Sequence, residues 1–271
     1  MPGAQQNKQP QASFFRALET QLRVIRAMLL RELQNRFGRD NIGYLWLILE
    51  PMMLATVISS VHVIAATGSS KTGMAPFPFT LVGYCLFIIF RGTFGRSDHL
   101  FDNASPLLYH HMIRPLDIVI VKLIVEVLGC LSSLIILMTI AIAVGLAEFP
   151  VRPLDLMFAA LLISWLSFAG SMLVAAYTYD SHLLSRFVQP FSYFMVPLSG
   201  AFVTVSFLPP WAQAAMGWNP MSSIFEMARY GQFESASDRY IYWQYVVAFC
   251  SVTTYWGLLA VRRVRKRIRV A

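Results

Sequence analysis

The amino-acid sequence predicts an all-α integral membrane protein with six transmembrane helices. The chain has 271 residues, of which 56% are hydrophobic and only 13% are charged. A soluble domain usually carries about 25% charged residues, so the mean hydropathy of +0.56 is typical of a membrane protein. Stretches without Asp, Glu, Lys or Arg indicate the same class, and they cover residues 72–90, 127–147, 156–179, 187–225 and 240–261. Each stretch is long enough to cross a bilayer, which takes about 20 apolar residues.

A sixth span precedes these five stretches. Residues from Leu45 to Ala66 are uncharged apart from Glu50, and their length again fits a bilayer. We therefore predict one transmembrane domain over residues 41–261. The expected spans cover about 44–66, 76–97, 116–146, 154–177, 186–207 and 240–261.

The N-terminal region predicts a tail followed by a helix on the membrane surface. Residues 1–12 are polar and Gln-rich without a signal-peptide pattern, so we expect a disordered cytoplasmic tail. In residues 13–40, apolar side chains recur at steps of three and four, at Phe14, Leu18, Leu22, Ile25, Leu29, Leu33 and Phe37. This period predicts an amphipathic helix lying in the cytoplasmic interface. Packing on a soluble domain is the alternative, but the sequence contains no such domain.

Basic residues at both ends predict the orientation of the chain. Seven of the 22 Lys and Arg residues precede Leu45, and six more lie in residues 262–269. Because Lys and Arg favour the cytoplasmic side, both termini are expected there, with 262–271 as a basic tail. This distribution explains the net charge of +8, so we expect no nucleic-acid partner.

The motif "RFGRDNIGYLWLILEP" places a carboxylate and a proline inside the first span, at Glu50 and Pro51. An ionised carboxylate facing lipid costs several kcal/mol. We therefore expect Glu50 to face protein or a hydrated path. Its expected partner is a cation such as Arg91 or backbone N–H groups freed near Pro51.

Two further segments between or beside the spans are distinctive. Pro106 and Pro115 bracket "LLYHHMIR", which leaves room for a short cytoplasmic helix over about 103–114. Residues about 208–231 contain three prolines, two glycines and two tryptophans, and are too broken for a span but too apolar for open water. We expect short re-entrant helices there, before the last span.

The chain shows no pattern for covalent, metal or ATP chemistry. Motifs of the types H-E-x-x-H, C-x-x-C and G-x-S-x-G are absent, and "GSSKTG" at 68–73 lacks the glycines of a phosphate loop. We therefore expect neither an enzyme nor a bound cofactor or metal. A membrane enzyme would need clustered carboxylates, whereas Asp98, Asp102 and Asp117 are scattered. Sparse charges within the spans likewise disfavour a proton-coupled transporter.

Taken in order, these features resemble the permease subunits of ABC-2 type exporters, and among them the capsular polysaccharide export permeases of Gram-negative bacteria. The resemblance covers essentially the whole chain. Its most specific parts are the stretch from Arg39 to Pro51, with Gly43, Trp46 and Glu50 between, and the loop "LLYHHMIRPLDIVI". Permeases for another cargo, such as O-antigen, teichoic acid, lipid or drug, are the alternative within this class.

The resemblance implies the assembly and the cargo. Two copies of the chain would pair in the bacterial inner membrane and bind two cytoplasmic ATPase subunits, which would hold ATP and Mg²⁺. The complex would move a lipid-linked anionic polysaccharide, and periplasmic co-polymerase and outer-membrane exporter proteins would carry it onward. Membrane lipids would surround the spans.

The same resemblance, with the charges and rings of the sequence, implies two sets of site residues. The expected substrate path comprises Arg39, Tyr44, Trp46, Glu50, Arg91, Arg96 and Tyr193. The expected ATPase contacts comprise Arg31, Arg36, Leu107, Tyr109, His110 and Arg114. Arginines could guide an anionic glycan and rings could stack on its sugars. The alternatives are headgroup binding for the arginines, and lipid-facing packing or interfacial belts for the rings.

Overall fold

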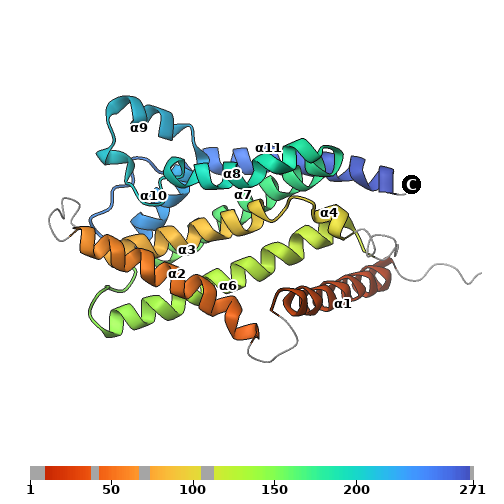
Figure 1. Cartoon of the computed structure of the whole chain (residues 1–271), viewed down its shortest axis with the longest axis horizontal. Helices are drawn as coiled ribbons and strands as arrows, with labels where there is room; N and C mark the ends of the chain where they lie inside the picture. The colour runs from red at the N-terminus through yellow and green to blue at the C-terminus, as the bar shows by residue number, and fades with distance from the viewer. Residues whose placement is uncertain (1–9, 38–42, 67–73, 105–112, 269–271) are drawn as a thin grey trace, which may run out of the picture.

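The computed structural model describes residues 10–37, 43–66, 74–104 and 113–268. The described chain is helical throughout, with short connections (Figure 1). The longer helices are α1 (Pro10–Phe37), α2 (Gly43–Ala66), α3 (Pro76–Gly95), α6 (Pro115–Ala143), α7 (Pro153–Asp180), α8 (His182–Leu198) and α11 (Trp243–Ile268). The shorter ones are α4 (Leu100–Asn103), η1 (Val205–Phe207), α9 (Pro210–Gly217) and α10 (Pro220–Gln232).

Five of the described helices are long and apolar enough to cross a membrane. They are Leu45–Ile64, Pro76–Gly95, Pro115–Ala143, Pro153–Asp180 and Trp243–Val264. Proline begins three of them, α3, α6 and α7, where its missing N–H costs no helical hydrogen bond. The class of fold is therefore that of a helical membrane protein.

The predicted fifth span differs from the structure. Helix α8 has 17 residues and ends at Leu198, well before residue 207. The backbone then turns at Gly200, whose φ of 78° falls in the left-handed region that glycine tolerates. At about 1.5 Å per residue, 17 residues rise about 26 Å, close to the thickness of the hydrocarbon core. A six-span arrangement remains a proposal.

Two other boundaries also differ from the expectation. Helix α1 begins at Pro10, three residues before the expected start at residue 13. Helix α11 begins at Trp243 and continues to Ile268, so the basic segment after 261 is helical over its first residues. Arginine and lysine are good helix formers, which is why the helix continues past the apolar residues.

Helix α3 forms the centre of the bundle, with α2, α6, α7 and α8 around it (Figure 1). Its side chains supply much of the main core, including the fully buried Leu81, Leu86, Phe87 and Ile89. A β-carbon at Gly83 would lie 2.2 Å from the carbonyl oxygen of Ala201. Glycine there lets the chain after α8 pack directly on α3.

A second cluster lies where α1, α4 and the end of α11 meet the start of α6. Its buried members include Met28, Phe101, Val119, Val261 and Val264. Helix α1 turns Val24, Ile25, Met28 and Leu29 towards this cluster, while Leu18 and Leu22 of the predicted apolar stripe remain 46% and 58% exposed. The packed face therefore shares Ile25 and Leu29 with the predicted stripe and adds Val24 and Met28.

The bundle has two different ends (Figure 1). Helices α1 and α4 and the C-terminus lie at one end, whereas α9, α10 and the connection between α6 and α7 lie at the other. We call these the terminal end and the opposite end.

Candidate functional site

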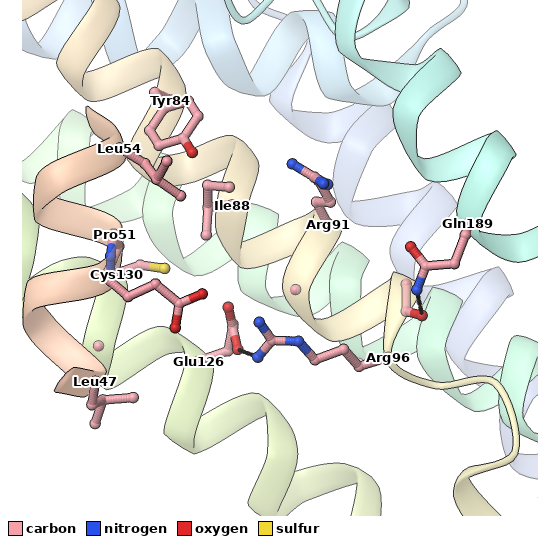
Figure 2. Close-up of a pocket in the computed structure, with 14 residues that line it drawn as sticks. Leu47, Pro51, Leu54, Tyr84, Ile88, Arg91, Arg96, Glu126, Cys130 and Gln189 are labelled. Carbon is pink, nitrogen blue, oxygen red and sulfur yellow. Dashed lines mark hydrogen bonds and ion pairs between the residues drawn. The ribbon is translucent and has the colours of Figure 1, made fainter. Parts of the chain in front are cut away.

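A polar cavity of about 170 Å³ lies inside the bundle, between α2, α3, α6 and α8 (Figure 2). Its wall contains the polar side chains of Glu50, Tyr84, Arg91, Arg96, Glu126 and Gln189. Most of these residues belong to segments that are otherwise apolar enough to cross a membrane. Charged groups at such a depth are expensive, so they commonly mark a path or a binding site.

Helix α2 turns one face to this cavity. Leu47, Glu50, Pro51 and Leu54 line it at steps of three and four, which is a single helical face. Glu50 therefore lines the cavity wall. In the described chain, no hydrogen bond or salt bridge holds its carboxylate.

Pro51 creates the close contact between α2 and α6. Proline has no N–H, so the carbonyl of Leu47 loses its helical donor. The chain therefore has a freed carbonyl at this point. A β-carbon at Gly129 would lie 2.9 Å from that carbonyl oxygen, and Ser133 Oγ donates to the carbonyl of Ile48 at 2.8 Å. Small residues on α6 thus let it approach α2 beside Pro51.

An ion pair joins α3 to α6 at the cavity. Arg96 Nη1 lies 3.1 Å from Glu126 Oε2, and the Glu126 side chain is only 6% exposed (Figure 2). Gly92 makes room for the carboxylate, because a β-carbon there would lie 2.0 Å from Glu126 Oε1. Lys122 Nζ, one turn before Glu126, donates to the carbonyl of Arg96 at 3.3 Å.

The same ion pair borders a second cavity, of about 390 Å³. Glu32 and Asn35 of α1, together with Lys122, line its other sides. Gly92, Arg96 and Glu126 belong to the walls of both cavities. The ion pair therefore stands between the cavity inside the bundle and a cavity beside α1.

Helix α8 closes the remaining side through two polar contacts with α3. The guanidinium carbon of Arg91 lies 4.0 Å from the ring centroid of Tyr193, a cation–π geometry. Gln189 Nε2 donates to the carbonyl of Gly95 at 2.6 Å (Figure 2). Two members of the expected path, Arg91 and Tyr193, are thus in direct contact.

The structure places the other expected site residues unequally. Trp46 is 46% exposed and lies outside the cavity wall. Arg31 and Arg114 are exposed near the terminal end. Arg39, Leu107, Tyr109 and His110 lie outside the described residues. The side chains of Arg36 and Tyr44 also lie outside the described part of the chain.

A buried carboxylate ties α1 to the start of α6. Asp117 is 2% exposed and accepts hydrogen bonds from Gln21 Nε2 of α1 at 2.6 Å and from the backbone N–H of Arg114 at 3.1 Å. Its position in the first turn of α6 also suits a negative charge. Helix α1, the expected interface helix, is therefore attached to the first turn of α6. This turn directly follows the segment that was expected to form the cytoplasmic helix over about 103–114.

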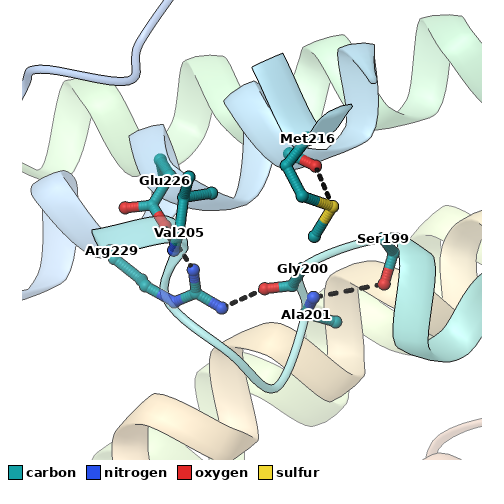
Figure 3. Close-up of polar contacts among 8 residues, drawn as sticks. Ser199, Gly200, Ala201, Val205, Met216, Glu226 and Arg229 are labelled. Atoms are coloured by element: carbon teal, nitrogen blue, oxygen red, sulfur yellow. Dashed lines mark hydrogen bonds and ion pairs between the residues drawn. The ribbon is translucent and has the colours of Figure 1, made fainter. Parts of the chain in front are cut away.

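A fully buried ion pair lies at the opposite end and was not anticipated from the sequence. Arg229 Nη1 lies 3.0 Å from Glu226 Oε1, and the two side chains are 3% and 4% exposed (Figure 3). Glu226 also accepts from the N–H of Val205 at 2.8 Å, and Arg229 donates to the carbonyl of Gly200. Burial lowers the pKa of Arg229 to about 10, while the charge of Glu226 opposes that decrease. Arg229 therefore stays protonated at neutral pH.

This pair explains how the chain between α8 and α10 is held. The spacing of Glu226 and Arg229, three residues apart in a nearly uncharged segment, is the signal that could have identified it. Gln189 and the pairing of Glu126 with Arg96 were also missed. No local pattern reveals them, because their partners lie on other helices.

Comparison with known proteins places these observations among transporters. Residues 23–233 match the family described as ABC-2 type transporter. The chain is 30% identical to the capsule polysaccharide export inner-membrane protein CtrC of Neisseria meningitidis serogroup B, over 94% of this chain and 96% of that protein. It is also 30% identical to BexB of Haemophilus influenzae, another capsule polysaccharide export inner-membrane protein, over 95% of this chain and 97% of that protein. Identity to the polysialic acid transport protein KpsM of Escherichia coli is 26% over 90% and 94%.

Proposed function

Since this chain belongs to the ABC-2 type transporter family, we propose that it is the transmembrane subunit of an ATP-binding cassette exporter for capsular polysaccharide. The observation that carries this function is the 30% identity, over nearly the whole chain, to capsule polysaccharide export inner-membrane proteins. The cargo is a lipid-linked acidic polysaccharide that crosses the inner membrane. The polar cavity among the spanning helices supports a transport role.

The working unit in this proposal is a dimer of the chain with two cytoplasmic ATPase subunits. The terminal end faces the cytoplasm, and ATP with Mg²⁺ binds only to the partner subunits. Periplasmic co-polymerase and outer-membrane proteins receive the polysaccharide. Gathering of the termini, α1 and α4 at one end supports this orientation (Figure 1).

Force from the ATPase reaches the bundle through α1 and the segment before α6. The Gln21–Asp117 hydrogen bond supports this route, since it joins α1 to the first turn of α6. Glu126, more than two turns after Asp117 in α6, forms the ion pair with Arg96. Movement of α6 relative to α3 would separate the two partners of that pair.

The Arg96–Glu126 ion pair serves as a gate between the two cavities. Three residues are common to both walls, so opening the pair would connect the cavity beside α1 with the cavity inside the bundle. An anionic group of the cargo would replace Glu126 as the partner of Arg96, which avoids leaving a cation unpaired. Arg91 would be the next cation along α3.

Association with an ATPase tests this function directly. The chain is expected to co-purify with an ABC ATPase from the same cell, and the reconstituted complex should hydrolyse ATP faster when the capsule glycolipid is present. Deletion of the gene should abolish surface capsule while glycolipid accumulates inside the cell. A chain that binds no ATPase and whose loss leaves the capsule unchanged would contradict the proposal.

A further inference from the structure

The opposite end of the molecule carries a third cavity, with the composition of a carbohydrate site. It measures about 610 Å³, and its wall includes Gln213, Trp218, Arg239, Tyr240, Tyr242 and Tyr245. Ligand cavities commonly measure 300–1,000 Å³ and combine aromatic side chains with a few polar groups. The cavity lies between α9 and the connection from α10 to α11, away from the Arg96–Glu126 gate.

Hydrogen bonds hold two walls of this cavity in place. The hydroxyl of Tyr245 donates to the carbonyl of Trp218 at 2.8 Å, and the hydroxyl of Tyr240 donates to Gln213 Oε1 at 2.9 Å. Gln213 Nε2 in turn donates to the carbonyl of Leu208 at 2.7 Å. Helix α9 is therefore braced against the chain before and at the start of α11. A ligand would meet a preformed surface, which reduces the entropic cost of binding.

Other groups in the wall remain available to a ligand. Trp218 is 80% exposed and Tyr242 is 48% exposed, although both line the cavity. In the described part of the chain, no protein group bonds the Tyr242 hydroxyl and no carboxylate pairs with Arg239. Aromatic faces carry negative charge density that attracts the C–H groups of a sugar ring, and a guanidinium binds carboxylates in a bidentate manner.

We propose that this cavity binds acidic polysaccharide as it leaves the membrane, with Trp218 and Tyr242 stacking on sugars and Arg239 pairing with a carboxylate. The acidic character of the ligand rests on the proposed function, whereas the site itself rests on the cavity. A polysaccharide bound at this site would be held as it emerges and hindered from moving back into the membrane.

A matched pair of tryptophans allows a sharp test. Trp211 and Trp218 both lie at helix α9 and are 77% and 80% exposed, but only Trp218 lines the cavity. If both rings served only as membrane anchors, their replacement would have equal effects. If the cavity binds sugar, only Trp218 contributes.

The measurement is fluorescence polarisation of labelled oligosialic acid with the full chain in nanodiscs, with labelled maltoheptaose as the neutral comparison. Trp218→Ala and Tyr242→Ala should each weaken binding about tenfold, the factor that ~1.4 kcal/mol represents. Trp211→Ala should retain wild-type affinity. Arg239→Gln should weaken binding of oligosialic acid and leave the weaker binding of maltoheptaose unchanged.

Three results would overturn this site. They are no binding of either oligosaccharide by the wild-type chain, equal losses for Trp211→Ala and Trp218→Ala, or unchanged affinity in Trp218→Ala. Each variant is also assayed for co-purification with the ATPase, which reports folding and assembly. Loss of sugar binding with intact ATPase association concerns this site alone, whereas failure of the wild-type chain to bind any ATPase concerns the proposed function.

Discussion

Single residues at the main cavity meet partners from other helices. Glu126 lies against the backbone of Gly92, and Arg96, the residue that directly follows α3, reaches the same carboxylate. Arg91 turns instead to the ring of Tyr193. Because a charge in a low-dielectric bundle is costly without a partner, changing Arg96 or Glu126 leaves the other charge unpaired.

Glu50 is the residue of the first span whose charge is expected to matter. Glu50→Gln keeps its size and polarity, so the chain should insert and fold, but capsule export should decrease about tenfold, the factor of ~1.4 kcal/mol in barrier. Export is measured as surface polysaccharide per permease molecule. The exposed Glu148→Gln is the control. Full export by Glu50→Leu would show that no charge is required at this position.

Gly92→Ala should break the gate while leaving the fold intact. The new methyl group would lie 2.0 Å from Glu126 Oε1, so the flexible carboxylate must move away from Arg96. Loss of this partly buried hydrogen-bonded pair should cost about 1–3 kcal/mol of stability. Basal ATP hydrolysis by the complex should rise and its stimulation by glycolipid should fall.

Gly95→Ala is the matched control for that change. It lies in the same helix and the same cavity wall, yet its β-carbon would come no closer than 3.4 Å to Ser192 Oγ, an ordinary contact. The coupling of hydrolysis to glycolipid should remain as in the wild type. Equal stimulation by glycolipid in Gly92→Ala and Gly95→Ala would show that the Arg96–Glu126 ion pair does not act as a gate.

At the scale of elements, helix α1 depends on a few contacts with α6. Met28 enters the second cluster, and Gln21 hydrogen-bonds to the buried Asp117. Val24, Ile25 and Leu29 pack beside Met28, whereas Leu18 and Leu22 stay exposed. A helix attached in this way can transmit force and still lie along the membrane surface.

Asp117→Ala should detach α1 from the start of α6. The change removes an acceptor for Gln21 and for the N–H of Arg114, which should cost about 1–3 kcal/mol. Trypsin should then cleave faster at the arginines of α1, and less ATPase should co-purify. Asp155→Ala is the control, because Asp155 follows the first proline of α7 at the same distance and makes no hydrogen bond to the described side chains of α1. Similar results for both variants would contradict this anchoring role.

Helix α10 depends on the buried Glu226–Arg229 pair. Glu226→Ala removes the partner of Arg229, a cation whose side chain is only 3% exposed in the structure. Removal of one member of a buried ion pair costs about 3–5 kcal/mol. The expected result is a clear decrease in the unfolding temperature in detergent. The exposed Glu234→Ala should stay within about 0.5 kcal/mol of the wild type. An unchanged unfolding temperature for Glu226→Ala would show that the Glu226–Arg229 pair does not stabilise helix α10.

At the scale of the whole molecule, segments that lie at the same end of the bundle are expected to face the same side of the membrane. Both described termini lie at one end of the bundle, and α9 and α10 lie at the other (Figure 1). Such an arrangement needs an even number of crossings, so α8 with the following turn would complete the sixth. The buried Glu226–Arg229 pair holds the turn after α8 through Gly200 and Val205.

Cysteine labelling tests this arrangement, because the native Cys85, Cys130 and Cys250 are buried and should not react. Exposed positions at the two termini, Arg16→Cys and Arg263→Cys, should react with an impermeant maleimide only after the inner membrane is permeabilised. Ser237→Cys, on the α10–α11 connection, should react in spheroplasts without permeabilisation. Opposite labelling of the two terminal positions would indicate five spans.

The sequence by itself determined the class of the protein and the positions of its main helices. Apolar runs and terminal charge are local properties that decide insertion into a bilayer, so α2, α3, α6 and α7 begin within a residue of the expected spans. The same local information located Glu50, Arg91 and Arg96 near one another in the chain's first two spans, and the structure places them around one cavity.

Only the tertiary structure decided which side chains meet. Arg96 and Glu126 pair across α3 and α6, Gln21 reaches Asp117 from α1, and the turn at Gly200 ends α8 short of its expected length. These contacts depend on how the helices rotate and how closely small residues such as Gly92 let them approach. Hydropathy carries no information about either, because it averages over all faces of a helix.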